Sequence, residues 1–177
     1  MADIVPHRPV LKRPENSALL AHWDALRGDA VAPQRSSFHP MDVPRHLPRL
    51  IMLEPDLPAK ADIRIFGTEL AHRLGYDLTG QDMFDLYDSD RVHVVRELVT
   101  LVAEQHLVAV GYTDWTTPAG HVFTTENVWF PLICEDGKVT RLLGSLWEMT
   151  AIDADIVSLG DSLDKAENLS DRKFYQF

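Results

Sequence analysis

The sequence contains one cysteine, Cys134, among 177 residues, so no internal disulfide can form. It also lacks the run of about 18 apolar residues that a membrane-spanning helix needs. Its first residues, Met-Ala-Asp-Ile-Val-Pro, carry no apolar core of the length found in signal peptides. From these absences we expect a cytoplasmic protein in a reducing compartment.

Basic residues are too few for binding to a phosphate backbone. The formal net charge is −10, whereas affinity for nucleic acids depends largely on lysine and arginine. We therefore expect no nucleic-acid partner. Apolar residues make up 45% and charged residues 25% of the chain, which is ordinary for a globular protein, and the length suits one domain with extensions.

Motifs that carry catalysis or metal binding are also missing. The sequence has no Gly-x-Ser-x-Gly elbow, no phosphate-binding loop and no calcium-binding loop. The eight histidines are scattered without metal-ligand spacing, and His93 falls on the polar side of its predicted helix, where a haem ligand would be misplaced. We expect no enzyme, no metal site and no haem.

What the sequence does contain is a regular order of helices and strands. Apolar residues at helical spacing predict a helix over 15–27 and a longer one over 89–105. Alternating patterns predict strands over 49–54, 61–66, 107–116, 121–133 and 139–149, the last two joined by an Asp-Gly turn. This order is typical of an α+β fold with helices on one face of a five-stranded antiparallel sheet.

The first helix carries an apolar stripe that must cover another surface. The stripe consists of Leu19, Leu20, Trp23 and Leu26. It could cap the sheet of its own chain, or it could pair with the same helix of a second chain. We take these four residues as the candidate dimer interface.

One glycine-punctuated stretch, residues 63–80, supports a more specific interpretation. Its Phe66-Gly67-Thr68 and Gly75-Tyr76-Asp77-Leu78-Thr79-Gly80 resemble the helical insert of PAS sensor domains. Further matching pieces lie before and after it, over about residues 19–147: Leu20-x-x-Trp23-x-x-x-Arg27-Gly28, Pro33-x-Arg35, Pro40-x-Asp42, Asp85-Leu86-Tyr87, Pro131-Leu132 and Leu143-Gly144. In these pieces the chain resembles the single-domain PAS proteins of alphaproteobacteria.

The resemblance implies an N-terminal arm and helix (1–28), a PAS-like domain (29–150) and an acidic tail (151–177). It implies a non-catalytic sensor or adaptor in signal transduction, acting as a homodimer. Such a chain would signal to a separate protein such as a kinase or cyclic-nucleotide regulator. Cys134 does not lie in the Asn-Cys-Arg motif of flavin-binding PAS domains, so flavin is not expected and the cofactor is unknown.

A ligand site would need polar groups that point into the core. The candidate ligand-binding residues are Arg64, Tyr76, Tyr112, Glu126 and Phe130. Arg64 faces either the cavity or the outside, depending on the phase of its strand, and Glu126 lies on the more aliphatic face of its strand. An inward Arg64–Glu126 pair could hold a polar ligand or be structural. Two alternatives stay open: a small enzyme with Glu126 as base, and an interaction module without ligand.

Overall fold

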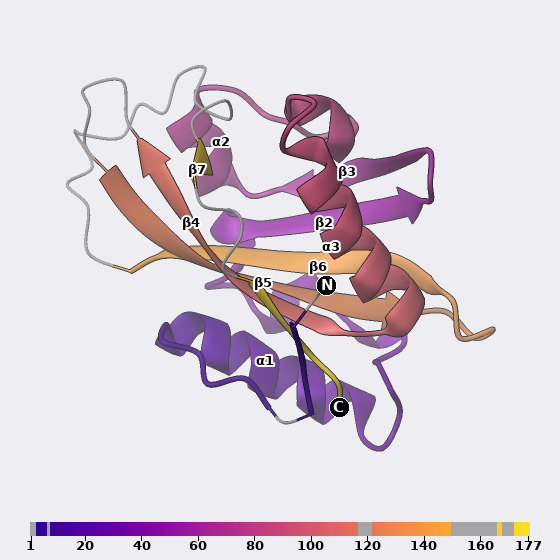
Figure 1. The fold of residues 1–177 in the computed structure, drawn as a ribbon. Coiled ribbons are helices and arrows are strands. Elements are labelled where there is room, and N and C mark those ends of the chain that lie inside the picture. Colours follow the sequence, from indigo (N-terminus) through magenta and orange to yellow (C-terminus); the bar gives the residue numbers. More distant parts are fainter. Residues whose placement is uncertain (1–2, 7, 117–121, 150–165, 168–171) are drawn as a thin grey trace.

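The computed structural model describes residues 3–6, 8–116, 122–149, 166–167 and 172–177. Its centre is a twisted sheet in which the strands follow the order β1-β8-β4-β5-β6-β2-β3, with β7 paired to β4 beside this path (Figure 1). The strands are β1 (Asp3–Val5), β2 (Leu50–Asp56), β3 (Lys60–Phe66), β4 (Val108–Thr116), β5 (Val122–Ile133), β6 (Val139–Glu148), β7 (Ala166–Glu167) and β8 (Arg172–Tyr175).

The expected five-stranded antiparallel sheet is present but forms only part of this larger sheet. Strands β4, β5, β6, β2 and β3 are antiparallel neighbours, as the alternating patterns predict. Beyond β4, the two ends of the chain add β8 and β1, and β1 runs parallel to β8. The sheet is therefore mixed. These short terminal segments have no turn or alternation strong enough to indicate a strand in the sequence.

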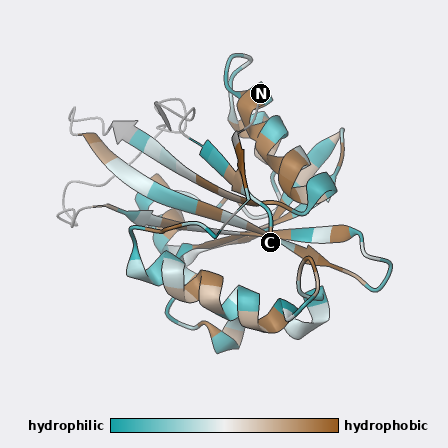
Figure 2. Ribbon diagram, turned by 60° about the horizontal axis from the view of Figure 1, so that its bottom comes forward, coloured by the Kyte–Doolittle hydropathy of each residue, from teal (hydrophilic) through white to brown (hydrophobic). Residues whose placement is uncertain are grey.

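Helices cover both faces of the sheet. One face carries α2 (Thr68–Leu74), the 3₁₀ turn η4 (Met83–Leu86) and α3 (Val92–Gln105), whereas α1 (Pro14–Arg27) covers the other face (Figure 1). Three further 3₁₀ turns, η1 (Arg35–Ser37), η2 (Pro40–Asp42) and η3 (Leu47–Arg49), lead from α1 into β2. In Figure 2, brown hydrophobic and teal hydrophilic residues alternate along the long helices, as expected for helices with one buried side. Within the described part of the chain, no helix is long and apolar enough to cross a membrane.

The sheet thus separates two apolar cores. The core under α3 contains Val95, Val99 and Val102, which recur at helical spacing and form a valine stripe on this helix. They pack against residues such as Trp129 and Leu142. The core under α1 contains Leu19 and Trp23, packed against residues such as Val128 and Phe130. Strand alternation produces this division, because successive side chains of one strand point to opposite faces.

The apolar stripe of α1 lies on its own sheet. Leu19 and Trp23 are fully buried, the Trp23 ring lies 5.6 Å from the Phe130 ring, and its Nε1 donates a hydrogen bond to Pro131 O. Leu20 and Leu26 are partly buried against the same core. This corrects the prediction that Leu19 and Trp23 face a second chain: they cover the sheet, the other role considered for the stripe.

Two glycines of the stretch 63–80 are required by their surroundings. A Cβ on Gly67 would lie 2.3 Å from Pro48 O, so glycine allows the turn between β3 and α2 to lie against the backbone of η3. Gly75 ends α2 with a φ of 85°, a conformation that other residues rarely adopt. Together they fix the position of α2 at one end of the sheet.

Candidate functional site

A cavity of about 120 Å³ lies between the sheet and α3. Most of its lining is apolar, from Ile51, Leu53, Phe66, Leu70, Leu74, Met83, Val94, Val95, Leu98, Val99, Phe123, Trp129 and Leu146. Gly111 also contributes, and the polar lining consists of Arg73, Tyr87, Thr113, Thr125, Asn127, Glu148 and Arg172. A mostly apolar cavity with a few polar groups is the usual character of a small-molecule site.

The two sides of the cavity come from different periodicities. The helix side is formed by residues one turn apart on α3, such as Val95 and Val99, which the valine stripe of the sequence predicts. The sheet side is formed by every second residue of β4 and β5, including Gly111, Thr113 and Asn127. The sheet side is therefore the polar one, and it faces an apolar helix.

Three polar atoms of cavity-lining residues are buried without a hydrogen-bond partner among the described residues: Arg73 Nη1, Asn127 Oδ1 and Arg172 Nε. Arg73 Nη1 is ion-paired with Glu148, whereas Asn127 Oδ1 and Arg172 Nε have no such pair among these residues. The other end of the Asn127 amide donates to Thr113 Oγ1 at 2.7 Å. Buried polar atoms are nearly always hydrogen-bonded, so Asn127 Oδ1 and Arg172 Nε leave hydrogen-bonding capacity unused in residues that line the cavity.

Arg172 also joins the last strand to the helix above the cavity. Its Nη1 donates to Val94 O, and its Nη2 lies 3.6 Å from Glu97 Oε2. Burial lowers the pKa of the guanidinium from its usual value, an effect that Glu97 partly offsets. The side chain is thus held in place by α3, while Nε has no hydrogen-bond partner in the part of the chain that the structure describes.

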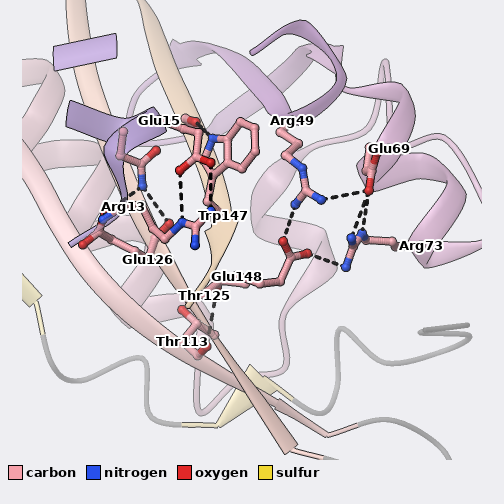
Figure 3. A network of polar contacts seen from close by, with 12 residues as sticks. Arg13, Glu15, Arg49, Glu69, Arg73, Thr113, Thr125, Glu126, Trp147 and Glu148 are labelled. Carbon is pink, nitrogen blue, oxygen red and sulfur yellow. Dashed lines mark hydrogen bonds and ion pairs between the residues drawn. The ribbon is translucent and has the colours of Figure 1, made fainter. Parts of the chain in front are cut away.

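A network of four charged side chains lies at another side of the cavity (Figure 3). Glu148 of β6 pairs with both Arg49 and Arg73, and Glu69 of α2 pairs with the same two arginines. The Arg49 Nη1–Glu148 Oε2 distance is 2.6 Å, and the Arg49 Nη2–Glu69 Oε1 distance is 2.8 Å. A hydrogen bond from Arg73 lowers the pKa of Glu69. Arg73 and Glu148 line the cavity, so this network sets the charge at its border.

Tyr87 supplies a neutral polar group to the same lining. Burial raises the pKa of its hydroxyl to about 12. The hydroxyl therefore stays protonated over the whole physiological pH range, so Tyr87 adds no charge to the cavity lining.

A second polar cluster lies on the opposite face of the sheet, under the start of α1. Glu126 is fully buried there. Its carboxylate accepts hydrogen bonds from the backbone N–H groups of Lys12 (2.6 Å) and Arg13 (2.9 Å). Asn16 Nδ2 (3.1 Å) and the Tyr112 hydroxyl (3.0 Å) donate to it as well. Figure 3 shows Glu126 beside Arg13. This cluster fastens the N-terminal arm to β5 and leaves the carboxylate with no access to the cavity.

The predicted ligand-binding residues lie apart from the cavity. Tyr112, Glu126 and Phe130 share the α1 face of the sheet, and the first two are hydrogen-bonded to each other. Tyr76 is 41% exposed, just after α2. Arg64 is exposed and pairs with Glu54 and Asp62, at an irregularity where the register between β2 and β3 shifts. Of the two orientations considered for Arg64, the structure has the outward one, so no Arg64–Glu126 pair forms.

Sequence reasoning missed the polar residues of the cavity. Asn127 could have been identified as a candidate from the sequence. Alternation along β5 places its side chain on the other face of the sheet from Glu126, together with Thr125 and Trp129. No signal in the sequence indicates Arg172, since its position depends on the pairing of β8 with β4, a strand far earlier in the chain. Among the described residues, no three His, Cys, Asp or Glu side chains come together as metal ligands.

The comparisons with known proteins agree with this architecture. A PAS domain family model matches residues 11–147, and the chain belongs to this family, whose members typically act in sensory signal transduction. No curated protein sequence matches the chain.

Solved structures of similar fold share little sequence with it. One is a light-oxygen-voltage domain studied with a flavin analogue, with 16% identity and a TM-score of 0.46, covering 65% of this chain and 84% of that one. The light-oxygen-voltage protein of Rhodobacter sphaeroides has 14% identity and a TM-score of 0.46, and the match covers 61% of this chain and 62% of that protein chain. A PAS domain from Colwellia psychrerythraea has 19% identity and a TM-score of 0.39, covering 56% and 85%. Similarities this weak carry no argument about whether this chain binds a ligand.

Proposed function

We propose that this PAS domain is a non-catalytic cytoplasmic sensor that holds a small molecule in the cavity under α3. It would pass its ligand state to a separate signalling protein such as a kinase or a cyclic-nucleotide regulator. The observation that carries the proposal is the cavity itself, which is apolar on the helix side and has two unpartnered buried polar atoms in its lining. Membership of the PAS family supports the sensory role.

The proposal can be tested by native mass spectrometry of the purified full chain. We expect a small molecule to be retained by the wild type and lost in Val95→Phe, because the larger side chain fills the cavity from α3. His93→Phe is the matched control, since His93 is exposed on the same helix. A molecule retained equally by Val95→Phe would place the ligand elsewhere and contradict the proposal.

The ligand-free adaptor is the second candidate. If the wild type shows only the mass of the polypeptide in every preparation, the adaptor replaces the sensor as the best-supported function. The position of Glu126 disfavours the enzyme alternative, because its carboxylate already accepts hydrogen bonds from four donors and the N-terminal arm covers it. Catalytic turnover that is lost in Glu126→Gln while the fold persists would favour the enzyme instead.

We also propose that the chain acts as a homodimer. Leu19 and Trp23 are buried in their own core, so a dimer contact of α1 would use its flank, where Leu20 and Leu26 are only partly buried. This is the part of the predicted interface that a second subunit could still reach.

A further inference from the structure

The two unpartnered polar groups of the cavity lie in register across three neighbouring strands. Gly111 of β4 is directly opposite Arg172 of β8 on one side and directly opposite Asn127 of β5 on the other. Since neighbouring strands are about 4.8 Å apart, the two residues flank Gly111 with their Cα atoms roughly 10 Å from each other. Glycine has no side chain, so the sheet side of the cavity is bare backbone between a guanidinium and an amide.

This arrangement provides hydrogen-bond donors for an anionic group. Arg172 Nε has an N–H to donate, and among the described residues the partner of the neighbouring Nη2 is Glu97, in a longer ion pair. A carboxylate is the acceptor that matches a guanidinium edge, and charge-assisted hydrogen bonds are the strongest of those available here. On the other side, a half-turn of the Asn127 amide lets Nδ2 donate to the ligand and Oδ1 accept from the Thr113 hydroxyl.

The rest of the cavity sets the size and polarity of the ligand. Drug-sized ligands occupy pockets of about 300–1,000 Å³, whereas an engineered apolar cavity of about 150 Å³ in another protein binds benzene. A cavity of about 120 Å³ lined by Val95, Leu98 and Val99 therefore suits a single ring or a short alkyl chain.

We propose that the cavity binds a small apolar monocarboxylate, with its carboxylate over Gly111 between Arg172 and Asn127 and its apolar body against α3. This inference rests on the proposed function, because it names the ligand class of the same cavity. Ligand binding at Arg172 would also affect other parts of the chain. Arg172 belongs to β8, which pairs with β1 and β4, so an anion at Arg172 strengthens the docking of the two chain ends on the sheet.

The test compares two ligands of nearly equal shape on the isotope-labelled full chain: benzoate, which carries the carboxylate, and benzyl alcohol, which does not. Dissociation constants come from chemical-shift titrations, with the resonances of α3 and β4 as reporters of the cavity. We expect benzoate to bind about tenfold more tightly than benzyl alcohol.

Two variants test the polar contacts separately. Asn127→Asp puts a negative charge beside the carboxylate, so it should weaken benzoate about tenfold and leave benzyl alcohol unchanged. Arg172→Met should remove the preference for benzoate. Lys173→Met is the matched control, because Lys173 is the exposed neighbour on β8. If the loss of Arg172 loosens β8, Asn127→Asp still tests the carboxylate site, because Asn127 belongs to β5.

The outcomes separate the two proposals. If benzoate and benzyl alcohol bind the cavity alike, or if Asn127→Asp binds both as the wild type does, the carboxylate inference is overturned while a cavity sensor stands. If neither compound shifts any resonance of α3 or β4 and native mass spectra show no bound molecule, the sensor function fails together with the inference.

Discussion

The indole ring of Trp129 lies flat against Gly144, its directly opposite neighbour on β6. A Cβ added to Gly144 would lie 2.5 Å from Trp129 Cζ3, closer than any real contact. Trp129 lines the cavity, so the absence of a side chain at Gly144 determines where one wall of the cavity stands.

Gly144→Ala should therefore push the indole toward the cavity and destabilise the fold by about 1–3 kcal/mol, the usual cost of overpacking. Chemical denaturation measures the free energy of unfolding. In a double-mutant cycle with Trp129→Leu, which removes the ring, most of this cost should vanish. Additive effects of the two substitutions would show that the ring and the glycine are not coupled.

Glu126→Gln should release the N-terminal arm. The glutamine amide keeps the size but replaces one acceptor oxygen by a donor. That donor then faces either the N–H of Lys12, which donates to Oε2, or the N–H of Arg13, which donates to Oε1. We expect a loss of about 2–3 kcal/mol in the free energy of unfolding and faster hydrogen exchange at residues 12 and 13. Glu104→Gln on the exposed side of α3 is the control. Exchange rates in the arm equal to those of the wild type would contradict this role of Glu126.

The four-residue network predicts unequal roles for its two acids. Glu148→Gln should cost about 1–3 kcal/mol, because its side chain is only 12% exposed and holds both Arg49 and Arg73. Glu69→Gln should cost less than about 1 kcal/mol, since Glu69 is 41% exposed and solvent screens its ion pairs. Thermal or chemical unfolding of the two variants in parallel measures the difference. A larger loss in Glu69→Gln would reverse the assignment.

The raised pKa of Tyr87 predicts that the free energy of unfolding falls at high pH. The pKa of its hydroxyl is about 12 in the folded chain, whereas an unfolded tyrosine titrates near about 10. Below about pH 10 the hydroxyl is protonated in both states and contributes no pH dependence. Between about pH 10 and 12 the unfolded state loses this proton first, so the free energy of unfolding falls.

Absorbance at the phenolate band and denaturation at several pH values measure this effect. Tyr87→Phe should lack the late titration step and show a flatter decline of stability above about pH 10. Tyr76→Phe is the control, because Tyr76 is exposed. If both variants titrate alike, the burial of Tyr87 does not control its ionisation.

The proposed homodimer contact predicts sensitivity at Leu20. Leu20→Glu should shift the full chain from dimer to monomer in light scattering, because a charge on the flank of α1 must be desolvated on association. Ala21→Glu, at the exposed neighbouring position, should leave the dimer intact. A dimer that persists in Leu20→Glu would exclude this flank as the contact.

Much of the fold could be predicted because it depends on local periodicity. The structure confirms the long helices, with α1 at Pro14–Arg27 and α3 at Val92–Gln105, and the strands β2 to β6 within a few residues of their expected ranges. The start of α3 is three residues later than predicted. Asp88 accepts hydrogen bonds from the backbone N–H groups of Asp90 and Arg91, so the chain forms a turn there before the helix begins.

The candidate site was harder to predict because it depends on which face of a strand is covered by which element. The pattern of β5 shows that Glu126 and Asn127 point to opposite faces, but it leaves open which way Glu126 faces; in the structure Glu126 is buried on the α1 side. The pattern does not show that both faces are buried. Since α1 covers one face and α3 the other, the inward acid serves the N-terminal arm, while the neighbouring amide serves the cavity.

By itself, then, the sequence determined the helices, the antiparallel strands and the PAS-type order, since periodicity, glycine punctuation and turn residues act over short distances. Only the tertiary structure decided that Leu19 and Trp23 cover their own sheet and that Arg64 points outward at an irregularity of β3. It also decided that Arg172 completes the cavity. These features arise from pairings between distant segments, such as β8 with β4, whose energies come from contacts that no local pattern contains.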